Sequence, residues 1–580
     1  MATSLRDIPG ANRQRPSRLR RGRRKSIWGP SRVPGIDLGP RPLGLERRKP
    51  PRLYRPRRQV DVGLILLWLF FAVVVMLGVR AGWKATRVDV SAAGITDDML
   101  LTATAAEGLA VELTFVKAEH LERADLTFDG RSVRDEVDVD GRTLRWRPAA
   151  VGEGEHELRL AVPRMVLADA VFSWDLVVDG TPPVIDVPPV LDPVPIDDPV
   201  TVTGRVDEGS TLTIDGERVP LDDGTFSLPF AIPPAGPLHL EAVDEAGNRT
   251  SGEVIVPVAY PGARGVHVTA AAWNYDELRQ GVLDLIDAGL IDTVELDLKD
   301  ESGIVGYDSQ VPRALEIGAV RPEYDLADTV ELLEARGVRV VGRIVAFRDP
   351  VLASAAWAAG QRDHVVQGPD GEPFAAYGGF TNYGHPDVRR YNIDIALEAV
   401  EAGVSDILWD YVRRPDGQPE TMVIPGLDGP STEAVAQFLA QSHEELRAQG
   451  AYQGASVFGI AASRPDALGQ HIPSMARHTD YLSPMVYPSH WVDGEYRVES
   501  PIRQPYEITS AALADFQAVA DGTGIGMVPW LQDFTLYGVP YGPAEVRAQI
   551  DAARAIGIDS FLLWNPGVRY TAEALVGLSG

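Results

Sequence analysis

Acidic side chains stand on a strand-like run in the C-terminal half of the chain, where they could carry acid–base chemistry. In the segment TVELDLKDESG, Glu295, Asp297 and Lys299 alternate with three aliphatic residues. In a β-strand this alternation turns the charged side chains to one face, which in a closed barrel is the interior. Unpaired buried charges are costly, so the face is either a salt-bridge layer or an active site. Asp300 and Glu301 follow at the end of the run and favour the active site.

Asp410 makes a similar case in the segment DILWDYVRRP. It is an acid on a run that is otherwise apolar and aromatic, and it shares one face with Leu408 and Val412. A carboxylate at the end of a strand can serve as nucleophile or proton donor for a glycosidic bond. Arg413 follows closely and could pair with it, which would keep Asp410 ionised. The alternative is a purely structural Asp–Arg pair.

Further residues near the ends of strand-like runs suit a polyhydroxylated ligand, because aromatic faces pack on sugar rings and polar groups bind hydroxyls. A single aromatic residue belongs to the core more often than to a site, but clustering at five strand ends favours a site. The aromatic residues are Trp357, Trp409, Tyr411, Tyr487, Trp491, Trp530 and Trp564. The polar residues are Arg343, His490, Gln532, Asp533 and Asn565.

Eight β-branched runs, each followed by a helix-like segment, position these residues. The runs are 266–269, 293–299, 339–347, 406–412, 455–461, 481–487, 526–533 and 560–564. Strands that alternate with helices predict a parallel sheet, and eight such units predict an α/β fold of the closed (β/α)8 TIM-barrel type over residues 264–580. In that fold the chemistry lies at the C-terminal ends of the strands, so the chain is predicted to be an enzyme.

Several common chemistries lack their motifs. The chain has no G-x-S-x-G, no H-E-x-x-H, no phosphate-binding loop and no glycine fingerprint for a dinucleotide. It has no cysteine, which excludes disulfides, thiolate metal sites and a cysteine nucleophile. His385 and Asp387 form an H-x-D motif without an evident third ligand nearby. We therefore predict no metal and no cofactor.

The N-terminal part predicts a membrane anchor. Residues 1–60 hold 18 Lys/Arg and 3 Asp/Glu, a net charge of +15. The whole chain has a net charge of −27, so the remaining residues carry −42. This basic tail reads as disordered and cytoplasmic, in contact with anionic lipid headgroups rather than nucleic acid. The apolar run 62–79 is long enough to cross a bilayer, so we predict a signal anchor over 61–82 with the later domains outside the cytoplasm.

Residues 84–260 predict two β-sandwich modules between the anchor and the barrel. Short alternating runs are separated by Gly and Asp turns, and a proline-rich linker at 178–195 divides the region. The module at 181–260 resembles bacterial immunoglobulin-like modules through its G-x-V, I-x-G-x-x-V, D-G-x-F and A-x-D-x-A-G-N progression. The module at 84–180 shares only the succession of short strand-like runs and turns. Such modules are expected to space a catalytic head from a membrane.

The barrel region resembles a glycoside hydrolase family that was catalogued as a domain of unknown function related to α-amylase-type barrels. The resemblance lies in LKDESG, GRIVAFRDP, YNIDIALEAV, DYVRRP, SPMVYPSHW, PWLQDF and LLWNP, which occur in the family's order. Two positions depart from the pattern: Arg414 replaces Phe, and Gly342 replaces Ala. The resemblance supports Asp297, Lys299, Asp300, Arg343, Asp410, Arg413, Tyr487, His490, Gln532 and Asn565 as site residues. Residues 455–463 offer no Glu of the kind that α-amylase relatives use as general acid.

Together these patterns predict a membrane-anchored glycoside hydrolase that cleaves an extracytoplasmic polysaccharide. Asp410 is the principal catalytic carboxylate, and its partner is Asp297, Asp300 or Asp533. The predicted substrate-binding residues are Lys299, Arg343, Tyr411, Arg413, Tyr487, His490, Trp530, Gln532, Trp564 and Asn565. The alternatives are a non-catalytic glycan-binding protein and a structural protein of the cell envelope.

Overall fold

The computed structural model describes residues 62–164 and 167–578. The chain separates into two compact units, residues 1–85 and residues 86–580. The predicted basic tail and its lipid contact lie outside the described residues.

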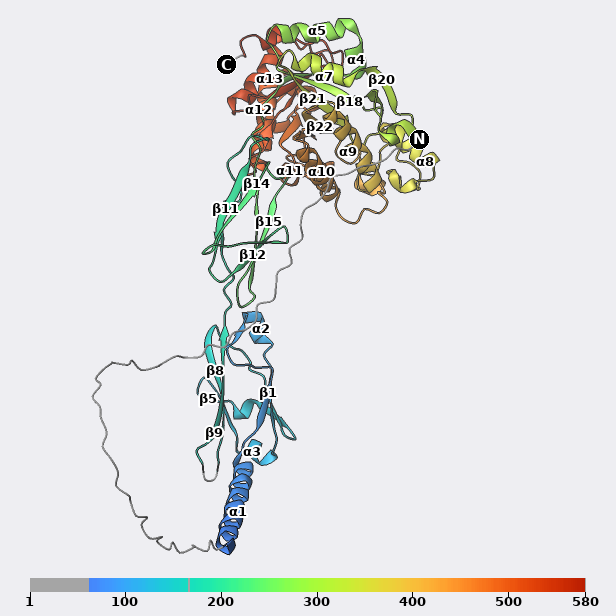
Figure 1. Ribbon diagram of the computed structural model, residues 1–580. Helices are drawn as coiled ribbons and strands as arrows, with labels where there is room; N and C mark the ends of the chain where they lie inside the picture. Colours follow the sequence, from blue (N-terminus) through green and yellow to red (C-terminus); the bar gives the residue numbers. More distant parts are fainter. Residues whose placement is uncertain (1–61, 165–166, 579–580) are drawn as a thin grey trace, which may run out of the picture. The chain divides into compact units, whose positions relative to one another are not determined.

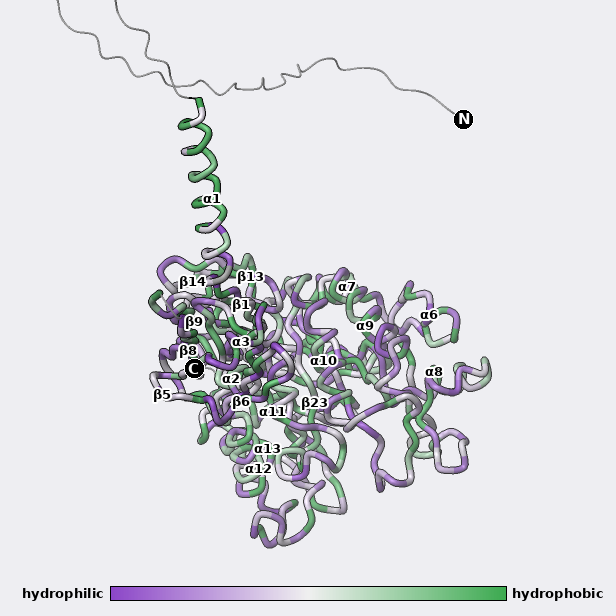
Figure 2. The backbone as a smooth tube through the Cα atoms, turned by 90° about the horizontal axis from the view of Figure 1, so that it is seen from below, coloured by the Kyte–Doolittle hydropathy of each residue, from purple (hydrophilic) through white to green (hydrophobic). Residues whose placement is uncertain are grey.

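Helix α1 (Val62–Thr86) contains the predicted apolar run and extends it by seven residues. In the part of the chain that the structure describes, it is the one helix long and apolar enough to cross a membrane. An 18-residue window within its segment Val62–Lys84 has a mean hydropathy of 2.9. Figure 2 shows its hydrophobic colouring along most of its length. The large apolar side chains of α1, such as Phe70 and Met76, are exposed in the isolated chain.

The first β module consists of two sheets around one hydrophobic core. The strand orders are β1-β3-β7-β6 and β2-β9-β8-β4-β5. Trp146 of one sheet and Leu158 of the other are fully buried in the shared core. The elements are β1 (Val90–Ala93), β2 (Met99–Leu101), α2 (Ala103–Glu107), β3 (Val111–Phe115), α3 (Ala118–Arg123), β4 (Asp125–Phe128), β5 (Arg131–Ser132), β6 (Val137–Asp140), β7 (Thr143–Trp146), β8 (Gly154–Val162) and β9 (Ala170–Val178).

The second β module also has two sheets, in the orders β10-β11-β14 and β13-β12-β15-β16, around a core that includes Val202, Phe226 and Leu240. The predicted turn joins β15 to β16, where Asp244 Oδ1 accepts the backbone N–H groups of Gly247 and Asn248. An immunoglobulin-like topology stays a prediction for both modules. The strands are β10 (Ile185–Asp186), β11 (Val200–Val206), β12 (Thr211–Ile214), β13 (Glu217–Val219), β14 (Thr225–Phe230), β15 (Leu238–Val243) and β16 (Arg249–Val254).

The C-terminal region is a closed barrel of eight parallel strands, which confirms the predicted barrel architecture. It closes because β17 pairs with both β18 and β27. The seventh strand is split at Val528 and Pro529 into β25 and β26, and both parts pair with β24. The barrel strands are β17 (Arg264–Val268), β18 (Thr293–Lys299), β21 (Arg339–Val345), β22 (Asp406–Asp410), β23 (Tyr452–Phe458), β24 (Tyr481–Met485), β25 (Gly526–Met527), β26 (Trp530–Gln532) and β27 (Phe561–Trp564).

Helices surround the strands, as Figure 1 shows for α7, α9, α12 and α13. The hydrophobic core between strands and helices contains Leu296, Ile344 and Ile407. Two short strands, β19 (Val305–Tyr307) and β20 (Val320–Tyr324), extend the sheet beyond β18. The helices are α4 (Ala270–Asn274), α5 (Asp276–Asp287), α6 (Pro312–Glu316), α7 (Leu326–Glu334), α8 (Pro350–Ala358), α9 (Pro386–Glu401), α10 (Ser431–Ala448), α11 (Ile472–Ala476), α12 (Pro505–Val519), α13 (Pro543–Ala555) and α14 (Ala572–Leu575).

The barrel interior is filled in layers. At the N-terminal end, the hydroxyls of Tyr260 and Tyr481 both donate to the carboxylate of Asp406, and the two rings lie 4.2 Å apart. Above them an apolar layer includes Val341, Leu408 and Leu562. Since β-strand side chains alternate, the residues two positions further along β21 and β22 also point inward, at the C-terminal end. These residues are Arg343 and Asp410.

Candidate active site

The guanidinium of Arg343 joins three acidic side chains at the C-terminal end of the barrel. Its Nη1 donates to Asp297 Oδ1 at 2.6 Å, and its Nη2 donates to Asp410 Oδ2 at 2.6 Å. Its Nε also donates to Asp410 Oδ2, at 3.0 Å, and its Nη2 also binds Glu301. The register of neighbouring strands accounts for this arrangement, because Asp297 of β18 lies opposite Arg343 of β21.

Burial and charge set different pKa values in this network. Asp297, Arg343 and Asp410 are between 1% and 5% exposed. Burial raises the pKa of Asp297 to about 7, against the attraction of Arg343 and His267. Burial acts in the same direction on Glu301, but the charge of Arg343 and its hydrogen bond lower the pKa of Glu301 to about 2. Near neutral pH the site therefore combines a carboxyl group that can hold a proton with one that stays ionised.

His267 and Glu295 form a second buried pair beside Asp297, and neither is among the predicted site residues. Nδ1 of His267 is hydrogen-bonded to Glu295, and its Nε2 lies 3.7 Å from Asp297 Oδ2. Burial lowers the pKa of His267, but the carboxylates of Glu295 and Asp297 outweigh it and raise that pKa to about 9. The signal was present in the sequence, because His267 alternates with Val266 and Val268 on β17 and so faces inward.

The backbone turns sharply directly after Asp410. Tyr411 has φ of 49°, a left-handed conformation that is costly for a residue with a bulky side chain. The turn brings the backbone N–H of Tyr411 to Asp410 Oδ1 at 2.6 Å. The Tyr411 hydroxyl accepts a hydrogen bond from Arg348 at 2.9 Å. Three N–H groups thus donate to the Asp410 carboxylate, an arrangement that suits its ionised form.

An aromatic wall made of Tyr487, His490, Phe534 and Trp564 stands at the ends of β24, β26 and β27. The ring of Tyr487 lies 5.3 Å from that of Trp564 and 5.1 Å from that of His490, and Phe534 meets Trp564 at 4.9 Å. Burial raises the pKa of Tyr487 well above its usual range, and the charge of Asp410 raises it further. Trp564 is half-buried and His490 is exposed.

Residues 265–570 match the model of a family described as "Putative glycosyl hydrolase domain". The chain belongs to this family. The matched segment contains the Arg343 network, the His267–Glu295 pair and the aromatic wall. No curated protein matches the chain.

Solved structures of low overall similarity also align with this glycosyl hydrolase chain. A hypothetical protein from Ruminiclostridium thermocellum is 30% identical over 33% of this chain and 96% of its own, with a TM-score of 0.29. The PgaB (BpsB) glycoside hydrolase domain from Bordetella bronchiseptica is 16% identical over 53% of this chain and 95% of its own, with a TM-score of 0.41. An α-galactosidase from Thermus thermophilus is 14% identical over 66% of this chain and 74% of its own, with a TM-score of 0.35. The family assignment rests on the family model.

The direction of the Lys299 side chain differs from the prediction for this glycosyl hydrolase barrel. The prediction that its side chain points into the barrel is wrong, because a β-bulge between Asp297 and Lys299 shifts the register of β18 against β21. The ammonium lies on the helix side, where it donates to Asp349 at 2.9 Å and to Asn392 of α9 at 2.7 Å. Lys299 is fully buried and has no surface left for a substrate.

Asp300 and Asp533, two of the three candidate partners of Asp410, have hydrogen-bond partners elsewhere in the protein. Asp300 Oδ1 accepts the N–H groups of Ser302 and Ile304 and so closes the turn before β19. Both oxygens of Asp533 bind Thr571, one through its backbone N–H and one through its hydroxyl. Asp297 remains as the predicted partner that shares a cation with Asp410.

Most of the other predicted binding residues also have partners within the protein. Gln532 is fully buried and bonds to Ser489 and Phe534, and Asn565 closes a turn with Gly567. Trp530 donates to Ser456 inside the barrel at 3.1 Å. The guanidinium of Arg413 bonds to Asp416 at 3.0 Å and lies over the ring of Tyr411. Substrate contact by Tyr411, Arg413, Tyr487, His490, Trp530, Gln532, Trp564 and Asn565 stays a prediction.

His267, Glu295 and Asp297 bring potential metal-ligand atoms within 4.8 Å of one another. The guanidinium of Arg343 lies among the same carboxylates, and its positive charge opposes a cation at this place. This group is therefore better suited to holding protons than to holding a metal.

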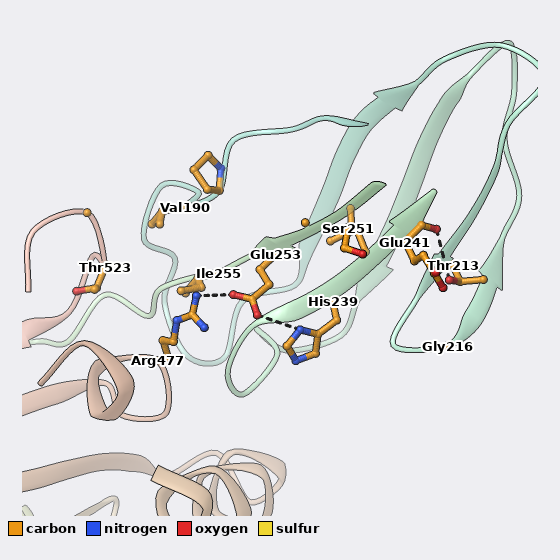
Figure 3. Close-up of a pocket in the computed structure, with 14 residues that line it drawn as sticks. Val190, Thr213, Gly216, His239, Glu241, Ser251, Glu253, Ile255, Arg477 and Thr523 are labelled. Carbon is orange, nitrogen blue, oxygen red and sulfur yellow. Dashed lines mark hydrogen bonds and ion pairs between the residues drawn. The ribbon is translucent and has the colours of Figure 1, made fainter. Parts of the chain in front are cut away.

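A cleft of about 870 Å³ lies at a different place, where the second β module meets the barrel (Figure 3). Its lining includes Ser251, Glu253 and His239 from the module and Arg477 and Thr523 from the barrel. Glu253 bonds to both Arg477 and His239, as the dashed lines in Figure 3 show. The residues around Arg343 do not line this cleft.

Proposed function

We propose that the chain is a membrane-anchored glycoside hydrolase that cleaves a polysaccharide outside the cytoplasm. The observation that carries the proposal is the guanidinium of Arg343, which holds Asp297 and Asp410 together at the C-terminal end of the barrel. Family membership supports the reaction class. The apolar helix α1, preceded by 18 basic residues, supports an anchor with a cytoplasmic N-terminus.

In the proposed reaction Asp297 donates its proton to the glycosidic oxygen as the bond from that oxygen to the anomeric carbon breaks. Asp410 attacks the anomeric carbon and forms a covalent glycosyl–enzyme. A water molecule then gives a proton to Asp297, attacks the anomeric carbon and releases Asp410. The division of roles follows from the environments, since Asp297 holds a proton near neutral pH and Asp410 receives three N–H groups. The product keeps its anomeric configuration.

The test uses a panel of aryl glycosides and purified bacterial envelope polysaccharides with the full chain. Asp410→Asn and Asp297→Asn should each lower turnover by at least about 10²-fold, the scale expected of a positioned catalytic group. Asp300→Asn is the matched control. It should keep turnover, because one side-chain oxygen of an asparagine can still accept both turn hydrogen bonds. Proton NMR of the first product should show retention.

Three results would count against the proposal: inversion, unchanged turnover of Asp410→Asn, or a loss of turnover in Asp300→Asn equal to that in Asp410→Asn. If thermal stability falls while turnover survives in Asp410→Asn, Asp410 is a member of a structural ion pair.

Non-catalytic glycan binding is the second candidate, and the burial of Asp297 and Asp410 favours it. In that case the wild-type chain should bind an envelope polysaccharide without releasing reducing ends. Asp410→Asn should then bind as well as the wild type.

A further inference from the structure

Two histidines and two aspartates meet on the outside of the barrel, in the long connection between β21 and β22. Asp363 and His364 lie in a 3₁₀ turn (Arg362–His364), and His385 and Asp387 lie at the start of α9. The imidazole rings of His364 and His385 are 4.0 Å apart. Ligand atoms of Asp363, His364 and His385 all lie within 4.8 Å of one another. The fold thus brings two further potential ligands, Asp363 and His364, next to the H-x-D motif, although they are distant from it in sequence.

A rigid scaffold holds the two segments together. Asn382 is fully buried, its backbone N–H donates to His364 O, and its side-chain amide donates to Asp363 O, both at 2.8 Å. The same amide also binds Pro425 O at 2.8 Å. These contacts fix the backbone of Asp363 and His364 against the start of α9. Ligands that are positioned in advance lose little conformational freedom when an ion binds.

The distances between the side chains suit an ion better than a direct contact. His364 Nε2 lies 3.7 Å from Asp387 Oδ2, and His385 Nε2 lies 3.7 Å from Asp363 Oδ2. Both are too long for a hydrogen bond. Zinc ligands at about 2.0 Å in a tetrahedral arrangement lie about 3.3 Å apart, so small side-chain shifts would close the cluster on one ion. The exposed carboxylates of Asp363 and Asp387 can make such shifts.

The neighbouring cations do not block an ion at this place. Arg313 and Arg390 line the same cleft of about 230 Å³ as His364 and Asp387. Arg313 is paired with Glu316, and Arg390 is paired with Asp394 and Glu445. Their charges are therefore largely balanced, whereas the two carboxylates of the cluster have imidazoles as their nearest partners.

We propose that Asp363, His364, His385 and Asp387 bind one divalent transition-metal ion, with Zn²⁺ as the best match to two imidazoles and two carboxylates. Binding through Nε2 of His385 places the proton on its Nδ1, so the contact of that atom with the backbone N–H of Asp387, at 3.2 Å, gives way. The ion joins residue 363 to residue 387 and braces the connection that carries Arg348, the partner of Tyr411 beside Asp410.

The test titrates Zn²⁺ into the full, untagged, chelator-treated chain by calorimetry and follows the melting temperature. His385→Asn removes the imidazole but keeps a good N-cap for α9, and His364→Gln removes the second ligand. The exposed His239 provides the control, His239→Ala. We expect one strong site in the wild type and in the control, with a rise in Tm of about 2–4 °C at saturating Zn²⁺. Both ligand variants should lose that site and that rise.

The proposal is overturned if the wild type shows no strong Zn²⁺ site, or if His385→Asn keeps the site and the Tm rise. It is also overturned if His239→Ala loses the site together with the ligand variants. An unfolding curve recorded without metal checks that each variant is folded.

Discussion

The charges around Arg343 decide the state of the candidate active site. Arg343 stabilises the ionised form of Glu301, while burial holds the pKa of Asp297 near 7 and the two carboxylates beside His267 hold its pKa near 9. The protonation of this site therefore changes across an ordinary experimental pH range. Asp297 and His267 can be tested separately, because the protonation of Asp297 affects the proposed reaction and the protonation of His267 affects folding.

Hydrolysis should fall as the pH rises through about 7, because Asp297 must hold a proton to donate it to the leaving group. The negative charge of Glu301 raises the pKa of Asp297. Glu301→Gln should therefore move this alkaline limb downward, by on the order of one pH unit. The limb is measured from kcat/KM against pH. Glu316→Gln, a change at an exposed ion pair with Arg313, is the control and should leave the limb in place.

Stability should fall between about pH 6.5 and pH 9 because of His267. Its folded-state pKa of about 9 lies above the usual value near 6.5, so folding binds a proton whose contribution is complete below pH 6.5 and is lost as the pH rises through 9. The shift corresponds to a fall in unfolding free energy on the order of 3 kcal/mol. Denaturant unfolding at both pH values measures it. Equal losses in wild type and His267→Gln would assign the pH dependence to other groups.

At the scale of elements, the β-bulge at the end of β18 separates two chemical environments. It leaves Asp297 inside the barrel and turns Lys299 toward the helix layer. There the ammonium of Lys299 forms an ion pair with Asp349, the N-cap of α8. The bulge therefore lets a single strand serve both the active site and the packing of the helices.

Lys299→Met should destabilise the chain by about 3–5 kcal/mol, because it leaves the buried carboxylate of Asp349 without a cation. Adding Asp349→Asn should recover much of the loss, since asparagine removes the charge and can still cap α8 through its side-chain oxygen. Unfolding free energies of the two variants provide the comparison. A double variant as unstable as the single one would show that the ammonium acts through its other contacts.

The elements could be predicted from the sequence more fully than the site. Alternation gave the bounds of β18, and with them the inward direction of Asp297, because a period of two residues is set by the strand alone. The direction of Lys299 could not be predicted, because a bulge depends on pairing with a neighbouring strand. Gln532 was predicted to be a binding residue from its place at a strand end, whereas its partner Ser489 lies in a loop that is distant in the sequence.

For the whole molecule, the second β module continues directly into the base of the barrel. Tyr260 precedes β17, yet its hydroxyl donates to Asp406 and its ring packs on Tyr481. Arg339 donates to the same hydroxyl at 3.0 Å. The predicted boundary at residue 264 stays a prediction, and an isolated barrel needs Tyr260 to fill this base.

The proposed topology predicts the outcome of protease treatment. In intact cells stripped of any outer barrier, added protease should digest the barrel and spare residues 1–60, because basic residues before an apolar helix stay in the cytoplasm. After electrophoresis, antibodies to residues 1–60 and to the barrel detect which of the two parts remains intact. A protected barrel would place the domain in the cytoplasm and remove the extracytoplasmic substrate from the proposal.

The pairing of β17 with β27 has a consequence for the order in which the chain can fold. Val266 pairs with Leu563, so the barrel is finished only when β27, the eighth strand, has arrived. Until then β17 and its neighbours present unpaired strand edges, which invite aggregation and degradation. The two β modules have cores of their own and can form earlier, during synthesis or export. A premature stop before residue 561 would therefore leave two folded modules attached to an open sheet that cells are expected to degrade.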